Sequence, residues 1–173
     1  MRRTITLLPL AIAACVPASR PPQPVPQSAP RIAAPAPLLV PALGPDWRDW
    51  PLTPGVWTYR RDARGSVAMF GHAGTDAALT LRCDLGGRQI YLSLAGTGVA
   101  PVTVRTSTTA RALLVQPTGG IPAYVAATLA PTDPLLDAAA FSRGRFIVEQ
   151  AGRPPLVIPA HAEIGRVAED CRD

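Results

Sequence analysis

The chain has 173 residues, of which 47% are apolar and 17% are charged, and this size and composition are typical of one folded domain with additional segments. Its formal net charge is +5, and every basic residue is an arginine. Aromatic residues make up only 5%, whereas a nucleic-acid-binding surface combines clustered basic residues with aromatic residues that stack on bases. The composition therefore argues against a nucleic-acid partner.

Residues 1–14 have the pattern of a secretory leader, because Arg2 and Arg3 precede an apolar run of ten residues, ITLLPLAIAA. A helix that spans a bilayer needs about 20 residues, so this run is too short to be one. The leader leads into Ile12-Ala13-Ala14-Cys15, which resembles the lipobox of bacterial lipoproteins. The resemblance implies that Cys15 becomes the lipid-carrying first residue of the mature protein. Cleavage at another position, with Cys15 incidental, is the alternative.

A lipid on Cys15 predicts where the protein resides. Several acyl chains together anchor a protein firmly to a membrane. The next residue is Val16 rather than aspartate, and in lipoproteins this implies sorting to the outer membrane. We therefore expect a domain that is anchored on the periplasmic face of the outer membrane, with the membrane as one partner and an envelope protein as another.

Cysteine usage supports export. If Cys15 is lipidated, Cys83 and Cys171 remain as a pair, and an oxidising compartment allows them to form a disulfide. Two buried free thiols are the alternative. The cysteines and the two histidines, His72 and His161, lack the spacing of zinc ligands, so we expect no metal and no cofactor.

Residues 15–45 form a proline-rich linker, with ten prolines among residues 16–45. Proline fixes the backbone angle φ and lacks an N–H donor, so neither a helix nor a sheet can run through this segment. We expect an extended spacer, and the alternative is a ligand for a proline-recognition module. The folded domain is expected to cover residues 46–173.

Period-two alternation predicts most of this domain to be strands. In residues 77–85, for example, Leu79, Leu81, Cys83 and Leu85 share one face, and Gly86-Gly87 predicts a two-residue hairpin turn. The predicted strands are 55–62, 66–71, 77–85, 88–96, 102–108, 110–116, 122–129, 145–150 and 155–159.

Two short helices complete the prediction. Asp133 as N-cap, Pro134 at the first helical position and Gly144 beyond the end delimit a helix within residues 132–144. A second helix is predicted for residues 160–171, with Cys171 on its apolar face. The expected fold class is mainly β (α+β): an antiparallel sheet or a small barrel or sandwich with two short helices, the last one C-terminal.

The layout of residues 55–172 resembles that of two families of small exported β-domains. The order LTLRC, IYLSL, VTVRT and a late helix that ends in EDCR is similar to the invasion-associated locus B family and to a type VI secretion accessory lipoprotein family. The resemblance implies a non-enzymatic periplasmic module in which Cys83 and Cys171 are the disulfide candidates.

The sequence contains no known catalytic motif. His72 and Asp76 have the spacing of a base and its orienting carboxylate, but no serine or cysteine is placed as a nucleophile, so we interpret His72 as a loop residue. The lone G-x-G in AGTGVA (95–100) is interpreted as a turn, because no helical pattern follows it. His161 and Glu163 are interpreted as structural or surface residues. We therefore expect that the protein is not an enzyme.

FSRGRF (141–146) is the most distinctive segment of the domain. It is either a helix C-cap, with Phe141 and Phe146 in the core, or a pair of arginines, Arg143 and Arg145, that binds a carboxylate or phosphate. Arg82 and Arg105, on outward strand positions, are the next candidates for anion or partner binding. The function expected is a lipid-anchored binding or structural module. The alternative is an inhibitor-type lipoprotein that binds a host hydrolase such as lysozyme.

Overall fold

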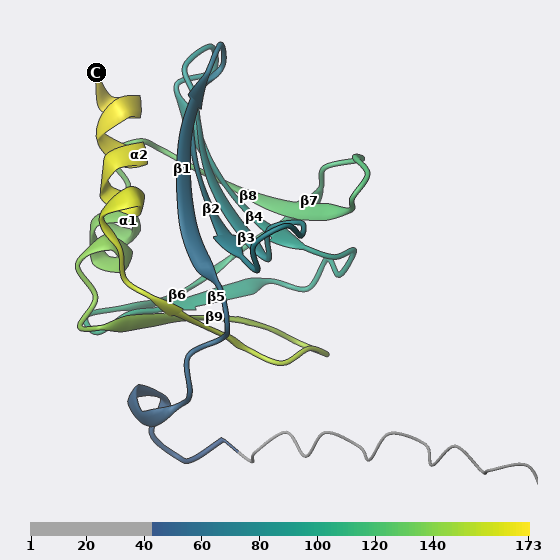
Figure 1. Ribbon diagram of the computed structural model, residues 1–173, viewed down its shortest axis with the longest axis vertical. Helices are drawn as coiled ribbons and strands as arrows, with labels where there is room; N and C mark the ends of the chain where they lie inside the picture. The colour runs from purple at the N-terminus through teal and green to yellow at the C-terminus, as the bar shows by residue number, and fades with distance from the viewer. Residues whose placement is uncertain (1–42) are drawn as a thin grey trace, which may run out of the picture. The chain divides into compact units, whose positions relative to one another are not determined.

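The structure is a computed structural model that describes residues 43–173. The predictions for the leader, for Cys15 and for the linker up to residue 42 lie outside the described residues. The described part folds into two antiparallel sheets and two α-helices (Figure 1), which confirms the expected mainly β fold class. None of its helices is both long enough and apolar enough to cross a membrane.

The larger sheet has six strands, and the smaller sheet has four. Figure 1 shows that the sheets meet at a steep angle. The order in the larger sheet is β1 (Val56–Asp62), β2 (Gly65–Gly71), β3 (Leu79–Asp84), β4 (Gln89–Ala95), β8 (Tyr124–Leu129) and β7 (Gln116–Pro117). The order in the smaller sheet is β10 (Leu156–Pro159), β9 (Arg145–Gln150), β5 (Val102–Arg105) and β6 (Ala110–Leu113).

The chain passes between the two sheets three times, from β4 to β5, from β6 to β7 and from β8 to β9. The predicted strand 110–116 is divided into β6 of the smaller sheet and β7 of the larger one, and Leu114 at the crossing is 81% exposed. On the opposite side, the N–H of Thr53 donates to the carbonyl of Val157 (2.8 Å) before the chain enters β1. The result is a sandwich that does not close into a barrel.

The core lies between the sheets and follows the predicted alternation. Leu79, Leu81 and Cys83 of β3 are 1%, 3% and 0% exposed, and β4 contributes Ile90, Leu92 and Leu94. The prediction for Leu85 was wrong: it is 49% exposed, because β3 ends at Asp84 and the chain turns away.

The turn between β3 and β4 also differs from the prediction. Asp84 pairs with Gln89, so the connection has four residues rather than the two glycines alone. The left-handed conformation falls on Arg88 (φ 47°) and not on Gly86 or Gly87.

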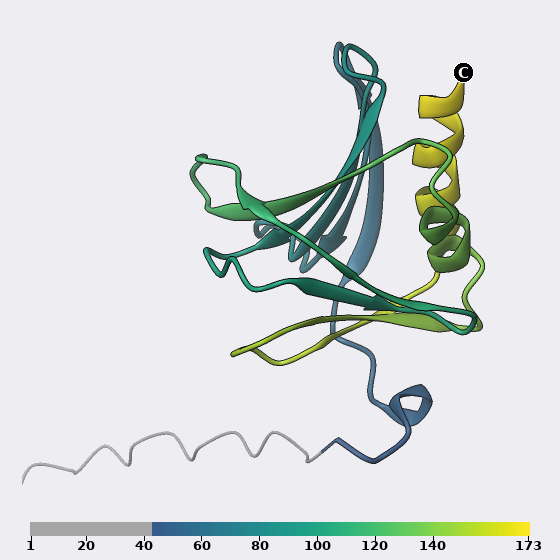
Figure 2. The same cartoon turned by 180° about the vertical axis from the view of Figure 1, so that it is seen from behind.

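The helices α1 (Pro134–Ala140) and α2 (Ala162–Arg172) pack against each other at one end of the sandwich (Figures 1 and 2). Asp133 caps α1 as predicted, because its carboxylate accepts from the N–H of Leu135 at 2.9 Å. A disulfide links Cys83 of β3 to Cys171 of α2, with the Cα atoms 5.4 Å apart, which confirms the predicted pairing.

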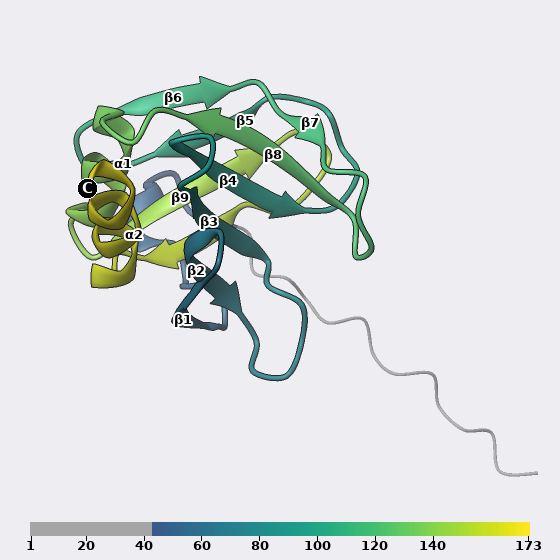
Figure 3. The same ribbon diagram turned by 90° about the horizontal axis from the view of Figure 1, so that it is seen from above.

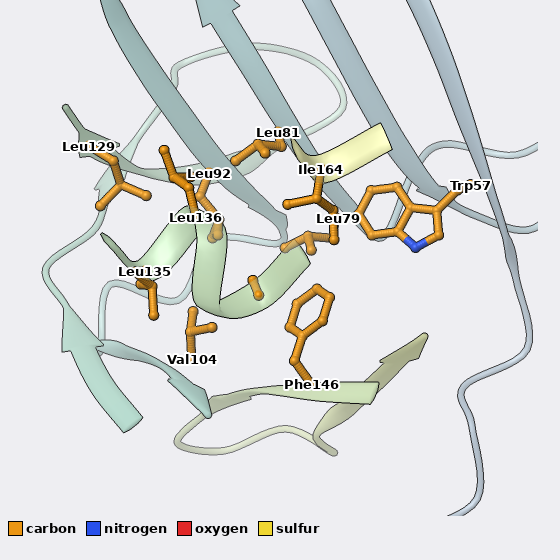
Figure 4. Close-up of a pocket in the computed structure, with 11 residues that line it drawn as sticks. Trp57, Leu79, Leu81, Leu92, Val104, Leu129, Leu135, Leu136, Phe146 and Ile164 are labelled. Atoms are coloured by element: carbon orange, nitrogen blue, oxygen red, sulfur yellow. The ribbon is translucent and has the colours of Figure 1, made fainter. Parts of the chain in front are cut away.

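The interior is closely filled. Figure 4 shows leucines from the larger sheet and from α1 pointing toward Trp57, Phe146 and Ile164 around a small apolar cavity. Its volume of about 20 Å³ is enough for about one water molecule. This cavity is too small for an organic ligand, so any binding site in the described residues lies on the surface.

Candidate partner-binding loop

Two of the four arginines singled out in the sequence form ion pairs within the sheets. Both guanidinium nitrogens of Arg82 donate to the carboxylate of Asp62, at 3.0 and 2.8 Å. Arg105 of β5 donates to Glu149 of the neighbouring β9 at 3.3 Å. These side chains stabilise cross-strand contacts and already have carboxylate partners.

Arg145 and Arg143 have different surroundings, although only one residue separates them. The guanidinium of Arg145 donates to the carbonyl of Trp50 and so fixes the segment that precedes β1. Arg143 is exposed, and its side chain makes no hydrogen bond or ion pair with any described residue. Every other arginine in residues 43–173 donates a side-chain hydrogen bond, forms an ion pair or stacks on an aromatic ring. Only Arg60 and Arg143 do none of these among the described residues. The two arginines of FSRGRF therefore do not form one paired site.

Phe141 is exposed beside Arg143, and the prediction that it lies in the core was wrong. Its exposed fraction is 80%, whereas Phe146 is 2% exposed as expected. The buried face of α1 is already formed by Leu135, Leu136 and Ala139. Since each helical residue rotates by about 100°, a residue two positions after Ala139 lies on the opposite side of the helix. This spacing was the signal in the sequence that could have placed Phe141 outside.

Residues 141–144, here called the FSRG loop, are held in place by Ser142. This side chain is 5% exposed. Its hydroxyl accepts from the N–H of Ser107 at 2.9 Å and donates to the carbonyl of Arg145 at 2.5 Å. The hydroxyl of Ser107 in turn accepts from the N–H of Arg143 at 3.2 Å. The turn between β5 and β6 thus fixes the backbone on both sides of the exposed residues.

Gly144 completes the loop and shows why glycine is required there. Its φ of 75° lies in the left-handed region, which a side chain disfavours. Its carbonyl accepts from the N–H of Ala160, which follows β10 (3.3 Å). The loop is therefore hydrogen-bonded both to the turn between β5 and β6 and to the residue that follows β10.

A shallow pocket of about 230 Å³ lies between α1 and the turn from β5 to β6, the two elements to which the FSRG loop is bound. Its lining is Thr108, Thr109, Arg111, Pro134, Leu135 and Ala138. Arg111 donates to Asp133 at 2.7 Å. Burial raises the pKa of Asp133, but the hydrogen bonds from Arg111 and from the N–H of Leu135 outweigh it and lower the pKa overall. The wall of the pocket is thus fixed by an ion pair.

The two exposed side chains of the loop, Phe141 and Arg143, are of types that protein interfaces use. Aromatic residues and arginine are enriched at the energetically important centres of interfaces. A guanidinium without a partner can form charge-assisted hydrogen bonds with a carboxylate. Because the backbone is already fixed, binding through Phe141 and Arg143 would cost little ordering entropy.

The histidines do not form a catalytic arrangement in the described residues. His72 is exposed, and its carbonyl, not its ring, accepts from Thr75. His161 contacts Glu163 at the start of α2, and although burial opposes the effect, this contact lowers the pKa of Glu163. Within residues 43–173, no cluster of three His, Cys, Asp or Glu side chains is arranged to hold a metal ion.

Comparison with protein-family models, with curated proteins and with solved structures finds no match for this chain. The resemblance to the invasion-associated locus B and type VI secretion accessory families stays a prediction. Any functional conclusion must therefore come from the residues themselves.

Proposed function

We propose that the protein is a lipid-anchored module of the bacterial cell envelope that binds a partner protein through the FSRG loop and catalyses no reaction. The observation that carries this proposal is the exposure of Phe141 and Arg143 on a loop whose backbone is locked by Ser107 and Ser142. The disulfide between Cys83 and Cys171 supports export, because such bonds persist in oxidising compartments.

The anchor is tested by the intact mass of the protein from its native membrane fraction, measured before and after reduction. We expect the loss of residues 1–14, the mass of acyl chains on Cys15, and a gain of two hydrogens on reduction. An unacylated mass with three free thiols would contradict both the anchor and the export.

The binding loop is tested by replacing Phe141 with a photo-crosslinking amino acid in the full chain in its native membrane. Leu114 is the matched control position. It is also an exposed apolar residue, with an exposed fraction of 81% against 80% for Phe141, but it lies in another part of the chain, between β6 and β7. We expect a distinct adduct from position 141 that weakens when Arg143→Ala is added. Equal adducts from both positions would show that the loop is not a specific site.

The inhibitor-type alternative is less well supported by this geometry. Inhibitor lipoproteins of this kind insert a protruding loop with a serine and a basic residue, and SRGR (142–145) is the segment of this chain that resembles such a loop. Here Ser142 is buried and uses its hydroxyl to fix the loop. A lysozyme inhibition assay with the full chain at equimolar concentration separates the two functions, since the proposed module leaves lysozyme active.

A further inference from the structure

The outer edge of β1 is open. Residues 56–62 pair with β2 on one side, and they make no backbone hydrogen bond with any other described residue. Figure 3 shows β1 at the margin of the larger sheet with no helix or strand beyond it. A strand edge of this kind presents unpaired N–H and C=O groups to any further strand.

The other sheet edges are short or covered. β7 has two residues and includes Pro117, which has no N–H to donate. β10 is covered by Thr53, whose N–H and hydroxyl both bond to Val157. β6 has four residues, whereas β1 has seven. The fold protects its other edges in the ways that natural sheets do and leaves this long one available.

We propose that β1 pairs antiparallel with β1 of a second copy of this chain, about a two-fold axis at Thr58. This pairing makes one continuous sheet from the two larger sheets. It uses a strand remote in sequence from the FSRG loop, so it does not depend on the partner-binding function.

The side chains of β1 are complementary to themselves in this register. Thr58 lies opposite Thr58 of the second copy, and Trp57 lies opposite Tyr59. Threonine pairs and aromatic pairs are among the cross-strand combinations that stabilise antiparallel sheets. Trp57 and Tyr59 are only partly buried in the single chain, so each has surface left to contact the other copy.

Charge selects this register over those whose axis lies at Tyr59 or at Arg60. A two-fold axis at Arg60 would place Arg60 directly opposite Arg60, and like charges in that position are destabilising. An axis at Tyr59 would leave the two Arg60 side chains diagonal to each other. With the axis at Thr58, Arg60 faces Val56, which is 55% exposed.

The remaining charges of β1 are already neutralised within each copy. Arg61 is paired with Asp170 of α2, and Asp62 is paired with Arg82 of β3. Of the charged residues of β1, only Arg60 lacks an oppositely charged partner among residues 43–173, and the proposed register keeps it away from other arginines.

The first test is disulfide trapping of the full chain, extracted from membranes in mild detergent. Directly opposite Cα atoms in an antiparallel pair are about 4.5–5.5 Å apart, which is within disulfide reach. Oxidised Thr58→Cys should therefore form a covalent homodimer. Thr128→Cys is the matched control, because it is an exposed threonine on the same face of the sheet but on the interior strand β8, and it should stay monomeric. A monomeric Thr58→Cys, equal dimer from both variants, or an adduct with a different protein would each overturn the proposal.

The second test changes the charge opposite Arg60. Val56→Glu should strengthen self-association in sedimentation equilibrium and Val56→Arg should weaken it, each by roughly fivefold, because two symmetric pairs of about 0.5 kcal/mol are altered. Position 56 is exposed, so neither change disturbs the core. Shifts in the same direction, or no shift in either variant, would overturn the register.

Discussion

The N–H of Ser107 donates to the hydroxyl of Ser142 at 2.9 Å, and the hydroxyl of Ser107 accepts from the residue after Ser142 at 3.2 Å. These two residues, 35 positions apart, bind the turn between β5 and β6 to the loop that follows α1. Ser142 is buried between two exposed residues, Phe141 and Arg143. The exposure of the candidate binding residues therefore depends on a buried serine.

Removing the Ser142 hydroxyl should loosen the loop and destabilise the fold. Ser142→Ala leaves the N–H of Ser107 and the carbonyl of Arg145 without this partner, and an unsatisfied buried group costs about 1–3 kcal/mol. Urea unfolding should show this loss, whereas Ser93→Ala should have little effect, because this strand serine makes no side-chain hydrogen bond within residues 43–173. Equal unfolding midpoints for the two variants would contradict the role of Ser142.

The alternation of the sequence predicted the strands well, but not how they divide between sheets. Alternation reports which side chains point inward, and it did so for β3 and β4. It carries no information on which strands are neighbours, so the division of 110–116 between two sheets was missed. Leu113 and Val115 are buried on either side of the exposed Leu114, which is the alternation that one continuous strand would also have, so only the strand pairing shows the crossing.

The candidate site was only partly predictable for a similar reason. Arg143 was singled out because of its sequence context, and its side chain has no hydrogen-bond or ion-pair partner in the described part of the chain. Arg82, Arg105 and Arg145 have the same chemistry, but residues distant in sequence provide their partners: Asp62, Glu149 and the Trp50 carbonyl. Local sequence cannot distinguish an available arginine from a paired one.

The disulfide should be a major source of stability. Cys83 and Cys171 are 0% and 1% exposed and are separated by 88 residues. Closing a loop of this length in the unfolded chain stabilises the fold by about 4–5 kcal/mol on the chain-entropy account. The double variant Cys83→Ala/Cys171→Ala should unfold at lower urea concentration, and reductant should shift the wild-type protein only. A wild-type midpoint that is unchanged by full reduction would contradict this expectation.

Asp62 should contribute to stability at neutral pH and lose that contribution in acid. The hydrogen bonds from Arg82 and from the N–H of Arg64 lower the pKa of Asp62 to about 2. The unfolded value is about 3.9, so the folded state favours the charged form. The stabilisation is therefore complete above about pH 4 and is lost as the pH falls toward 2.

Urea unfolding between pH 7 and pH 2 tests whether Asp62 stabilises the fold at neutral pH and loses this effect in acid. Asp62→Asn should lose stability at pH 7 and should show a shallower fall between pH 4 and pH 2 than the wild type. Asp49→Asn is the control, because Asp49 is exposed and makes no ion pair within the described residues. A fall of equal steepness in Asp62→Asn and wild type would show that Asp62 is not responsible.

Arg143 and Arg145 should respond in opposite ways to the same substitution. Arg145→Met removes the donor to the Trp50 carbonyl, so it should lower the free energy of unfolding by about 1–3 kcal/mol and speed proteolysis before β1. Arg143→Met removes no side-chain bond to any residue that the structure describes, so it should leave stability unchanged. In the crosslinking assay at position 141, however, Arg143→Met should reduce the adduct, because an exposed arginine beside an aromatic residue is the kind of side chain on which binding energy concentrates. If Arg143→Met destabilised the fold as much as Arg145→Met, the guanidinium would have an internal role. If instead Arg143→Met kept the adduct at full yield, Arg143 would not contribute to binding at the FSRG loop.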